Sequence, residues 1–166
     1  MLHSATPRDA LLFARSYSKS LLESIPDEKW FDMPGGITHV AWQVGHLAVA
    51  EWRLCLFRIR GPQPIDEEIF PLEYRRYFMT DDTPRADRSV YPSPARFREI
   101  LDNVHQQTLA EWPKFSEAFL AEPALGPAHP ICKTKADCLV WVAQHELIHS
   151  GQIGLLRRQL GFQPVW

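Results

Sequence analysis

Residues 131–163 read ICKTKADCLVWVAQHELIHSGQIGLLRRQLGFQ and contain no proline. Proline is excluded from helix interiors, so a proline-free window of this length can hold one uninterrupted helix. Thr134 can cap the N-terminus, and Gly161 after two arginines is typical of a helix end. The apolar residues recur at helical spacing and form a core-facing stripe: Leu139, Val142, Ile148, Ile153, Leu156 and Leu160. The window therefore predicts a long helix over about residues 134–160.

Three further windows are free of proline and have helical periodicity: residues 8–25, 35–61 and 95–112. Thr6 and Ser93 each stand before a proline at the first helical position, and Thr38 can cap the second window. No segment shows the sustained apolar and polar alternation of a strand. The sequence therefore predicts an all-α four-helix bundle that forms one domain over residues 1–166.

The ends of the second and third helices are also marked. Arg58 and Arg60 before Gly61 are cations suited to a helix C-terminus. Pro113 predicts a kink or a break near the end of the third helix.

Between these two helices, residues 62–92 contain five of the 14 prolines. We expect this long connection to cross the bundle or to act as a lid, with room for one short helix.

The composition excludes several classes of protein. The chain has 166 residues, a net charge of -2 and 45% hydrophobic residues, which is typical of one soluble domain that folds without a disulfide or a metal. Three cysteines without a CxxC spacing suggest a reducing, cytoplasmic environment, and the N-terminal residues lack the pattern of a secretion signal. No apolar run is long enough for a membrane span, and no basic cluster suggests a nucleic-acid partner.

The sequence His145-Glu146-Leu147-Ile148-His149 places two imidazoles on one helix face, where they can bind one metal. The pattern is also the H-E-x-x-H signature of zinc proteases. After His149 the chain contains no Asp, Glu, Cys or His, so the downstream third ligand of such proteases is missing. A zinc protease is therefore nearly excluded.

A third ligand has to come from upstream, where the candidates are His3, His39, His46, His105 and His129. His46 stands out, because it lies inside an apolar stretch of the second helix where an unpaired imidazole is costly to bury. His46, His145 and His149 all fall within about one turn of their helix midpoints, so the three rings can converge at mid-bundle. Such a site would leave a coordination position open on zinc, nickel, iron or cobalt. The alternative is that each histidine is an ordinary core or surface residue.

A second kind of metal site is also compatible with the sequence. Glu146-x-x-His149 and Asp102-x-x-His105 resemble the acid-x-x-His pairs of two-metal carboxylate bundles. Glu51 and Glu23 would then be the bridging ligands. Against this hypothesis, Asp is short for the role, and Glu146 points about 100° away from His145.

Two segments resemble the DinB-like superfamily of four-helix metalloproteins, which includes bacillithiol transferases and mycothiol-dependent maleylpyruvate isomerase. The segment from Thr38 to Leu47, THVAWQVGHL, is similar to the family's second-helix pattern. The segment from His145 to Ile153, HELIHSGQI, with the basic end of the same helix, is similar to its fourth-helix signature. The proline layout extends the resemblance across essentially the whole chain.

The resemblance implies that His46, His145 and His149 hold one divalent metal, most commonly Zn²⁺ or Ni²⁺, at the open end of the bundle. It also implies transfer of a low-molecular-weight thiol to an electrophilic small molecule, or a thiol-assisted isomerisation, in which the metal holds the thiol deprotonated. Relatives further suggest a homodimer. The alternatives are a non-catalytic, stress-related metal-binding protein and, with less support, a metal-dependent hydrolase. The catalytic group is unknown, beyond a metal-bound water or thiolate.

Four further residues are candidates for roles near the metal. Gln152, three residues after His149, can donate a hydrogen bond to an imidazole. Trp42 and Trp141 lie one turn from a candidate ligand and can line a substrate pocket or only fill the core. Arg53, two turns from His46, can bind an anionic thiol or substrate, or be an exposed charge.

Overall fold

The structure, a computed structural model, describes residues 6–79 and 83–165. Four long helices dominate it: α1 (Pro7–Leu22), α2 (Val40–Glu51), α6 (Pro94–Glu111) and α8 (Lys135–Gln159). Residues 6–79 and 83–165 form no strand, and their only β-type pairing is an isolated bridge between Pro123 and Thr134. The predicted all-α helical bundle is confirmed.

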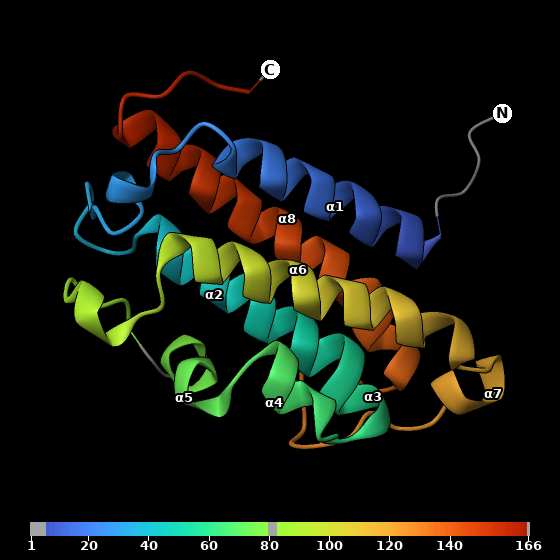
Figure 1. Ribbon diagram of the computed structural model, residues 1–166. Helices are drawn as coiled ribbons and strands as arrows, with labels where there is room; N and C mark the ends of the chain where they lie inside the picture. Colours follow the sequence, from blue (N-terminus) through green and yellow to red (C-terminus); the bar gives the residue numbers. More distant parts are fainter. Residues whose placement is uncertain (1–5, 80–82, 166) are drawn as a thin grey trace, which may run out of the picture.

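The four helices pack in two parallel pairs (Figure 1). α1 packs along α8, and these two helices run in the same direction. α2 packs along α6, and these two helices also run in the same direction, opposite to that of α1 and α8. α2 also contacts α8, which brings the middle of the second and fourth long helices together. Because α2 and α6 are parallel, the chain between them has to return along the length of the bundle. The long connection is therefore the predicted crossover.

The predicted helix starts are confirmed at three of the four long helices. Thr6 and Thr134 each accept a hydrogen bond from the third helical residue, and Ser93 accepts one from the amide of Arg96. The prediction for the second helix is wrong, because the cap is His39 and not Thr38. Nδ1 of His39 accepts a hydrogen bond from the amide of Trp42 at 3.0 Å, so an imidazole does here what a hydroxyl usually does.

The second helix does not stay α-helical along its whole length. α2 is followed without a break by the π-helical segment η2 (Trp52–Phe57) and by the short helix α3 (Arg58–Arg60). The rod ends where Gly61 adopts a φ of 80°, a conformation that favours glycine. The sequence placed this end correctly but gave no sign of the π-helical turn.

The connections contain more short helices than the sequence predicts. In its described residues, 62–79 and 83–92, the crossover holds two short helices instead of one, together with two 3₁₀ turns: α4 (Ile65–Ile69), α5 (Leu72–Arg75), η3 (Arg76–Phe78) and η4 (Arg88–Val90). The expected break at Pro113 is present, since α6 gives way to a 3₁₀ turn there. The remaining short elements lie between the long helices: η1 (Asp27–Lys29), η5 (Trp112–Lys114) and α7 (Glu117–Leu120).

A network of charged groups crosses the core between α1, α2, α6 and α8. Arg15, which is buried, donates to Glu51 at 2.7 Å and to Glu146 at 2.7 Å. Glu51 also bonds Nδ1 of His105 at 2.9 Å, and Glu146 accepts from Ser18 at 2.8 Å. The helices are therefore joined by ion pairs as well as by apolar packing. Among the described residues, no helix combines the length and the apolar character needed to cross a membrane.

Candidate metal centre

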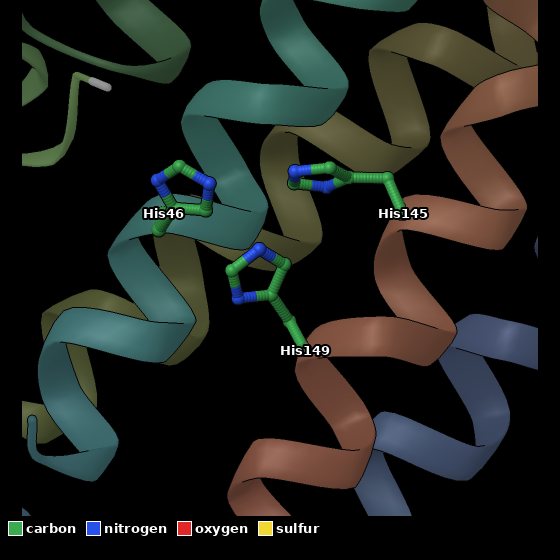
Figure 2. Close-up of side chains that lie close together, drawn as sticks. All are labelled: His46, His145 and His149. Carbon is green, nitrogen blue, oxygen red and sulfur yellow. The ribbon is translucent and has the colours of Figure 1, made fainter.

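Three histidine side chains from two helices gather near the middle of the bundle. His46 lies on α2, whereas His145 and His149 are one turn apart on α8, and Figure 2 shows the three rings directed toward a common space. One ligand nitrogen of each ring lies within 4.8 Å of the other two. Within the described ranges, no other group of three or more His, Cys, Asp or Glu side chains is arranged to hold a metal ion. This position near the middle of the bundle is the one predicted from the helix midpoints. The resemblance implied the open end of the bundle instead, and the helix bounds do not agree with that position.

His46 is held from two sides. Its Nδ1 lies 2.9 Å from the carbonyl oxygen of Phe78. Because a carbonyl only accepts, Nδ1 carries the proton and Nε2 keeps a lone pair for a metal. Trp42 stacks on the ring with 4.9 Å between centroids and 12° between planes. Gly45 allows Phe78 to come this close, since a Cβ at this position would lie 2.4 Å from the phenyl ring.

His149 is oriented by a buried amide that the sequence analysis missed. Its Nδ1 lies 2.7 Å from Oε1 of Gln43, whose Nε2 donates to Thr38 and Gln152 at 3.0 and 2.9 Å. The two bonds from Nε2 fix the amide so that its oxygen faces the imidazole. His149 therefore donates from Nδ1 and presents Nε2 to the site. The expected bond from Gln152 to an imidazole is replaced by a bond to Gln43, so Gln152 acts one step further away.

His145 has a nitrogen that fits an additional ligand. Its Nδ1 is buried and has no hydrogen-bond partner among the described residues. A buried polar atom without a partner is costly, and the cost is removed if a cation binds it. Trp141 packs against the ring of His145 in a T-shaped arrangement, with 6.1 Å between the ring centroids and 65° between the ring planes. The donor set of three imidazoles, two with a fixed tautomer and one with an orphaned nitrogen, fits a divalent metal.

The imidazoles are held in the neutral form that binds metals. Burial lowers the pKa of His46, against a smaller opposing effect of its bond to Phe78. Burial, followed by repulsion from His46 and His129, lowers the pKa of His145 to about 4. Burial, followed by repulsion from His46 and His145, lowers the pKa of His149 to about 3. Protons therefore compete little for these nitrogens at neutral pH.

A cavity of about 400 Å³ adjoins the histidines. His46 and His145 form part of its wall, and two of the predicted substrate-binding residues, Arg53 and Trp141, also line it. Trp42, the third, is not part of the wall but packs on His46 and donates from Nε1 to the carbonyl of Tyr77 at 3.2 Å.

The carboxylates proposed for a two-metal site have other partners. Glu51 and Glu146 are both bound to Arg15, whose guanidinium occupies the place between them. Asp102 pairs with Lys19 at the surface, and Glu23 is exposed. These groups do not assemble a second metal centre, and the hypothesis of a two-metal site is not supported.

The other candidate third ligands also have separate places. His39 caps α2, and His105 bonds Glu51. His129 lines the same cavity but does not belong to the cluster of three, and His3 lies outside the described residues. The three cysteines are buried free thiols, and Cys138 is fully inaccessible.

Comparison with known proteins identifies the family. No curated protein matches the chain significantly. A sequence model of the DinB superfamily matches residues 10–153, which include all three histidines of the cluster, the crossover and most of α8. Since the match spans most of the chain and the helical bundle agrees with it, the chain belongs to the DinB superfamily.

Proposed function

We propose that the chain binds one divalent metal, Zn²⁺ or Ni²⁺, through His46, His145 and His149 and catalyses transfer of a low-molecular-weight thiol to an electrophilic small molecule. The observation that carries the proposal is the convergence of three neutral imidazoles, one of them with an orphaned nitrogen, beside a cavity of about 400 Å³. A divalent metal there would supply a Lewis acid with an open position, which lowers the pKa of a thiol and makes it a nucleophile at neutral pH.

The surrounding residues prepare this chemistry by fixing geometry. Phe78 and Gln43 select the tautomers of His46 and His149, so that neither ring has to change its tautomer when a metal binds. Trp42 stacks on the ring of His46 and so favours its present orientation. Preorganised ligands of this kind hold a metal at fixed positions relative to the cavity wall.

In this proposal the electrophilic small molecule binds in the cavity beside the histidines. Trp141 and the aliphatic side chains of the wall exclude water from part of it, and Arg53 adds a positive charge. In the transfer, the thiol sulfur forms a bond to an electrophilic carbon, and the leaving group departs with the electron pair of the broken bond while the thiol gives up its proton. An electron-poor carbon next to an anionic group would suit this wall.

The first test is the metal content of the untagged protein by elemental analysis, beside His46→Ala and His149→Ala. We expect about one metal per chain in the wild type and less than about a tenth of that in both variants. His129→Ala is the matched control, because this histidine lines the same cavity outside the cluster of three. No metal after loading with zinc and nickel would refute the proposal.

The second test is thiol transfer by the metal-loaded protein. Bacillithiol, mycothiol and cysteine are incubated with an electrophilic dye, and conjugates are measured by mass spectrometry. We expect turnover that disappears in His149→Ala. A protein that holds metal tightly but leaves every thiol unreactive would instead have the non-catalytic metal-binding role.

A second copy of the chain is the proposed protein partner, and no nucleic acid is expected. Apolar side chains lie exposed along α8 and on α1, and one of them, Ile148, is a residue that the helical spacing wrongly predicted to face the core: Val140, Leu147, Ile148, Leu155 and Phe13. A second copy that packs α8 on α8 would bury them. Sedimentation equilibrium of the wild type and of Leu155→Glu tests this, and a monomeric wild type at micromolar concentration would contradict it.

A further inference from the structure

Arg58, the first residue of α3, is a buried cation that no acidic group neutralises within the described residues. Its exposed fraction is 1%, and Nη1 donates to the carbonyl oxygens of Leu125 and Pro127 at 3.2 and 3.0 Å. Nε is buried without a hydrogen-bond partner, and Nη2 makes no hydrogen bond within the described part of the chain. The Nε and Nη2 edge is one that an arginine uses to bind a carboxylate through two parallel bonds. That edge is unused here.

Other arginines of this bundle have acceptors for their terminal nitrogens. Buried Arg15 and half-buried Arg60 each bind two carboxylates. Buried Arg75 binds Glu67 at 2.8 Å, although its Nε has no hydrogen-bond partner among the described residues. Arg157 on α8 donates three hydrogen bonds through both terminal nitrogens. Arg58 lacks both a counter-charge and a partner for its Nε and Nη2 edge, which is unfavourable for a buried guanidinium, so its presence needs a reason other than stability. A ligand that supplies the counter-charge is such a reason.

The position of Arg58 indicates which ligand. Arg58 lines the same cavity as His46 and His145. Arg53 and His129 line it as well, whereas no Asp or Glu does among the described residues of the wall. Burial, and then the charges of Arg58, Arg53 and Lys133, lower the pKa of His129, so the cations near this part of the cavity act in the same direction on a group of its wall. The wall thus has a metal-ligand part and a cationic part.

We infer that Arg58 anchors an anion subsite in this cavity, and that the small molecule bound there carries a carboxylate. The planar guanidinium is already oriented by its two bonds to backbone carbonyls, so it offers a preformed fork. Arg58 lies 12 residues after His46, so their Cα atoms are roughly 15–18 Å apart along the helix axis, a distance that the two side chains and the ligand span together. A ligand that contacts both ends is therefore elongated, with its carboxylate several bonds away from the group that reacts at the histidines. The reactive end rests on the proposed function, but the carboxylate end does not.

The first experiment uses chelator-treated protein, so that it does not depend on metal binding. Adipate, a dicarboxylate, is titrated at low salt and followed by isothermal calorimetry and amide chemical shifts, with the uncharged adipamide beside it. We expect adipate to bind and adipamide not to bind. Arg58→Met, which keeps the length of the side chain, should raise the dissociation constant of adipate at least about tenfold. Arg157→Met is the matched control, because it removes another buried arginine that bonds backbone carbonyls and should leave adipate binding unchanged.

Stability of the same variants separates a binding role from a structural one. Because Met removes an uncompensated buried charge, we expect the midpoint of urea unfolding for Arg58→Met to stay at or above that of the wild type. If Arg58→Met does not fold, Arg58→Lys keeps the charge and loses the fork, and adipate binding to it should be weaker by at least about threefold. Equal adipate binding by the wild type and a folded Arg58 variant, or no binding by the wild type, would overturn the inference.

A second experiment connects the subsite to the histidines. The nickel-loaded protein is titrated with mercaptohexanoate and with the uncharged mercaptohexanol, and the sulfur-to-metal absorption band is measured. The wild type should bind the carboxylate form at least about tenfold more tightly, and Arg58→Met should bind both equally. A protein that binds adipate but no nickel would refute the proposed function and leave the anion subsite standing, whereas equal binding of both thiols by the wild type would refute the subsite's role in thiol recognition.

Discussion

Acidifying the metal-free protein from about pH 7.5 to about pH 5 is expected to lower its free energy of unfolding by about 4 kcal/mol. The reason is that the fold keeps several histidines neutral. The pKa of His39 is lowered to about 4 by burial, against smaller opposing bonds to backbone groups, and the pKa values of His145 and His149 lie at about 4 and about 3. In the unfolded chain the same groups have pKa values near 6.5.

The direction and the size of this change in the free energy of unfolding follow from proton binding. At a pH between the folded and the unfolded pKa values, the unfolded state binds more protons than the folded state. The contribution of these histidines to the free energy of unfolding is therefore fully present above about pH 6.5 and is lost as the pH falls toward 4. Over the 1.5 or so units from about 6.5 to about 5, each such histidine costs about 2 kcal/mol. His145 and His149 are only partly buried, so screening by water roughly halves the cost of each to about 1 kcal/mol. With about 2 kcal/mol for His39, the total is about 4 kcal/mol. His46 shifts in the same direction.

The assay is urea unfolding in the presence of a chelator, followed by tryptophan fluorescence, at several pH values across this range. Carboxylates contribute little here, because their unfolded pKa values lie near 4. His149→Asn is the informative variant, since it removes one titrating group and retains a side chain that can bond Gln43. The loss of stability on acidification should then shrink by about 1–2 kcal/mol. His129→Asn lines the same cavity outside the cluster and should change the loss by less.

A metal-free protein whose free energy of unfolding changes by less than about 1 kcal/mol over this range would refute the reasoning. It would mean that the histidines accept protons without unfolding, and hence that the site opens to water. An acid-induced loss of the expected size that His149→Asn leaves unchanged would assign the effect to other groups.

Three further perturbations test the supports of the site. Gln43→Leu removes the acceptor for Nδ1 of His149 and should weaken zinc binding about 10–100-fold in competition with a chromogenic chelator, and an unchanged affinity would contradict the orienting role. Gly45→Ala places a Cβ 2.4 Å from the ring of Phe78 and should cost about 1–3 kcal/mol in urea unfolding, together with weaker zinc binding, whereas a neutral effect would mean that Phe78 moves freely. Arg15→Met removes the arginine that neutralises two buried carboxylates and should lower the free energy of unfolding by about 3–5 kcal/mol, whereas breaking the exposed pair by Lys19→Met should cost at most about 1 kcal/mol.

The long helices could be predicted because proline and capping residues act locally. Thr6, Ser93 and Thr134 cap where the sequence places them. His39 was missed as a cap because its acceptor nitrogen depends on a tautomer that the surrounding fold selects. The short helices of the crossover have four or five residues, too few to show a periodicity. Their positions depend on contacts with the long helices.

The three histidines could be predicted because they are polar residues on otherwise apolar faces. Gln43 carries the same signal, since it is a buried amide three residues before His46, but a residue that positions a ligand has no motif of its own. Arg58 was interpreted as a favourable charge at a helix C-terminus. Only the packing of residues 125–127 over it shows that the guanidinium is buried and lines the cavity.

The π-helical segment η2 separates the two parts of the cavity along one continuous rod. Each residue of an α-helix turns the chain by about 100°, and a π-helical turn accommodates roughly one residue more than an α-helical turn. Removing one residue between positions 52 and 57 would therefore let this turn become α-helical and leave Arg58 and His46 facing nearly the same way as before. The same deletion in the regular helix α2, after His46, would instead rotate Arg58 by about 100° around the rod. The rod can thus lose a residue at the π-helical segment while the histidines and the cationic part of the cavity keep their relative places.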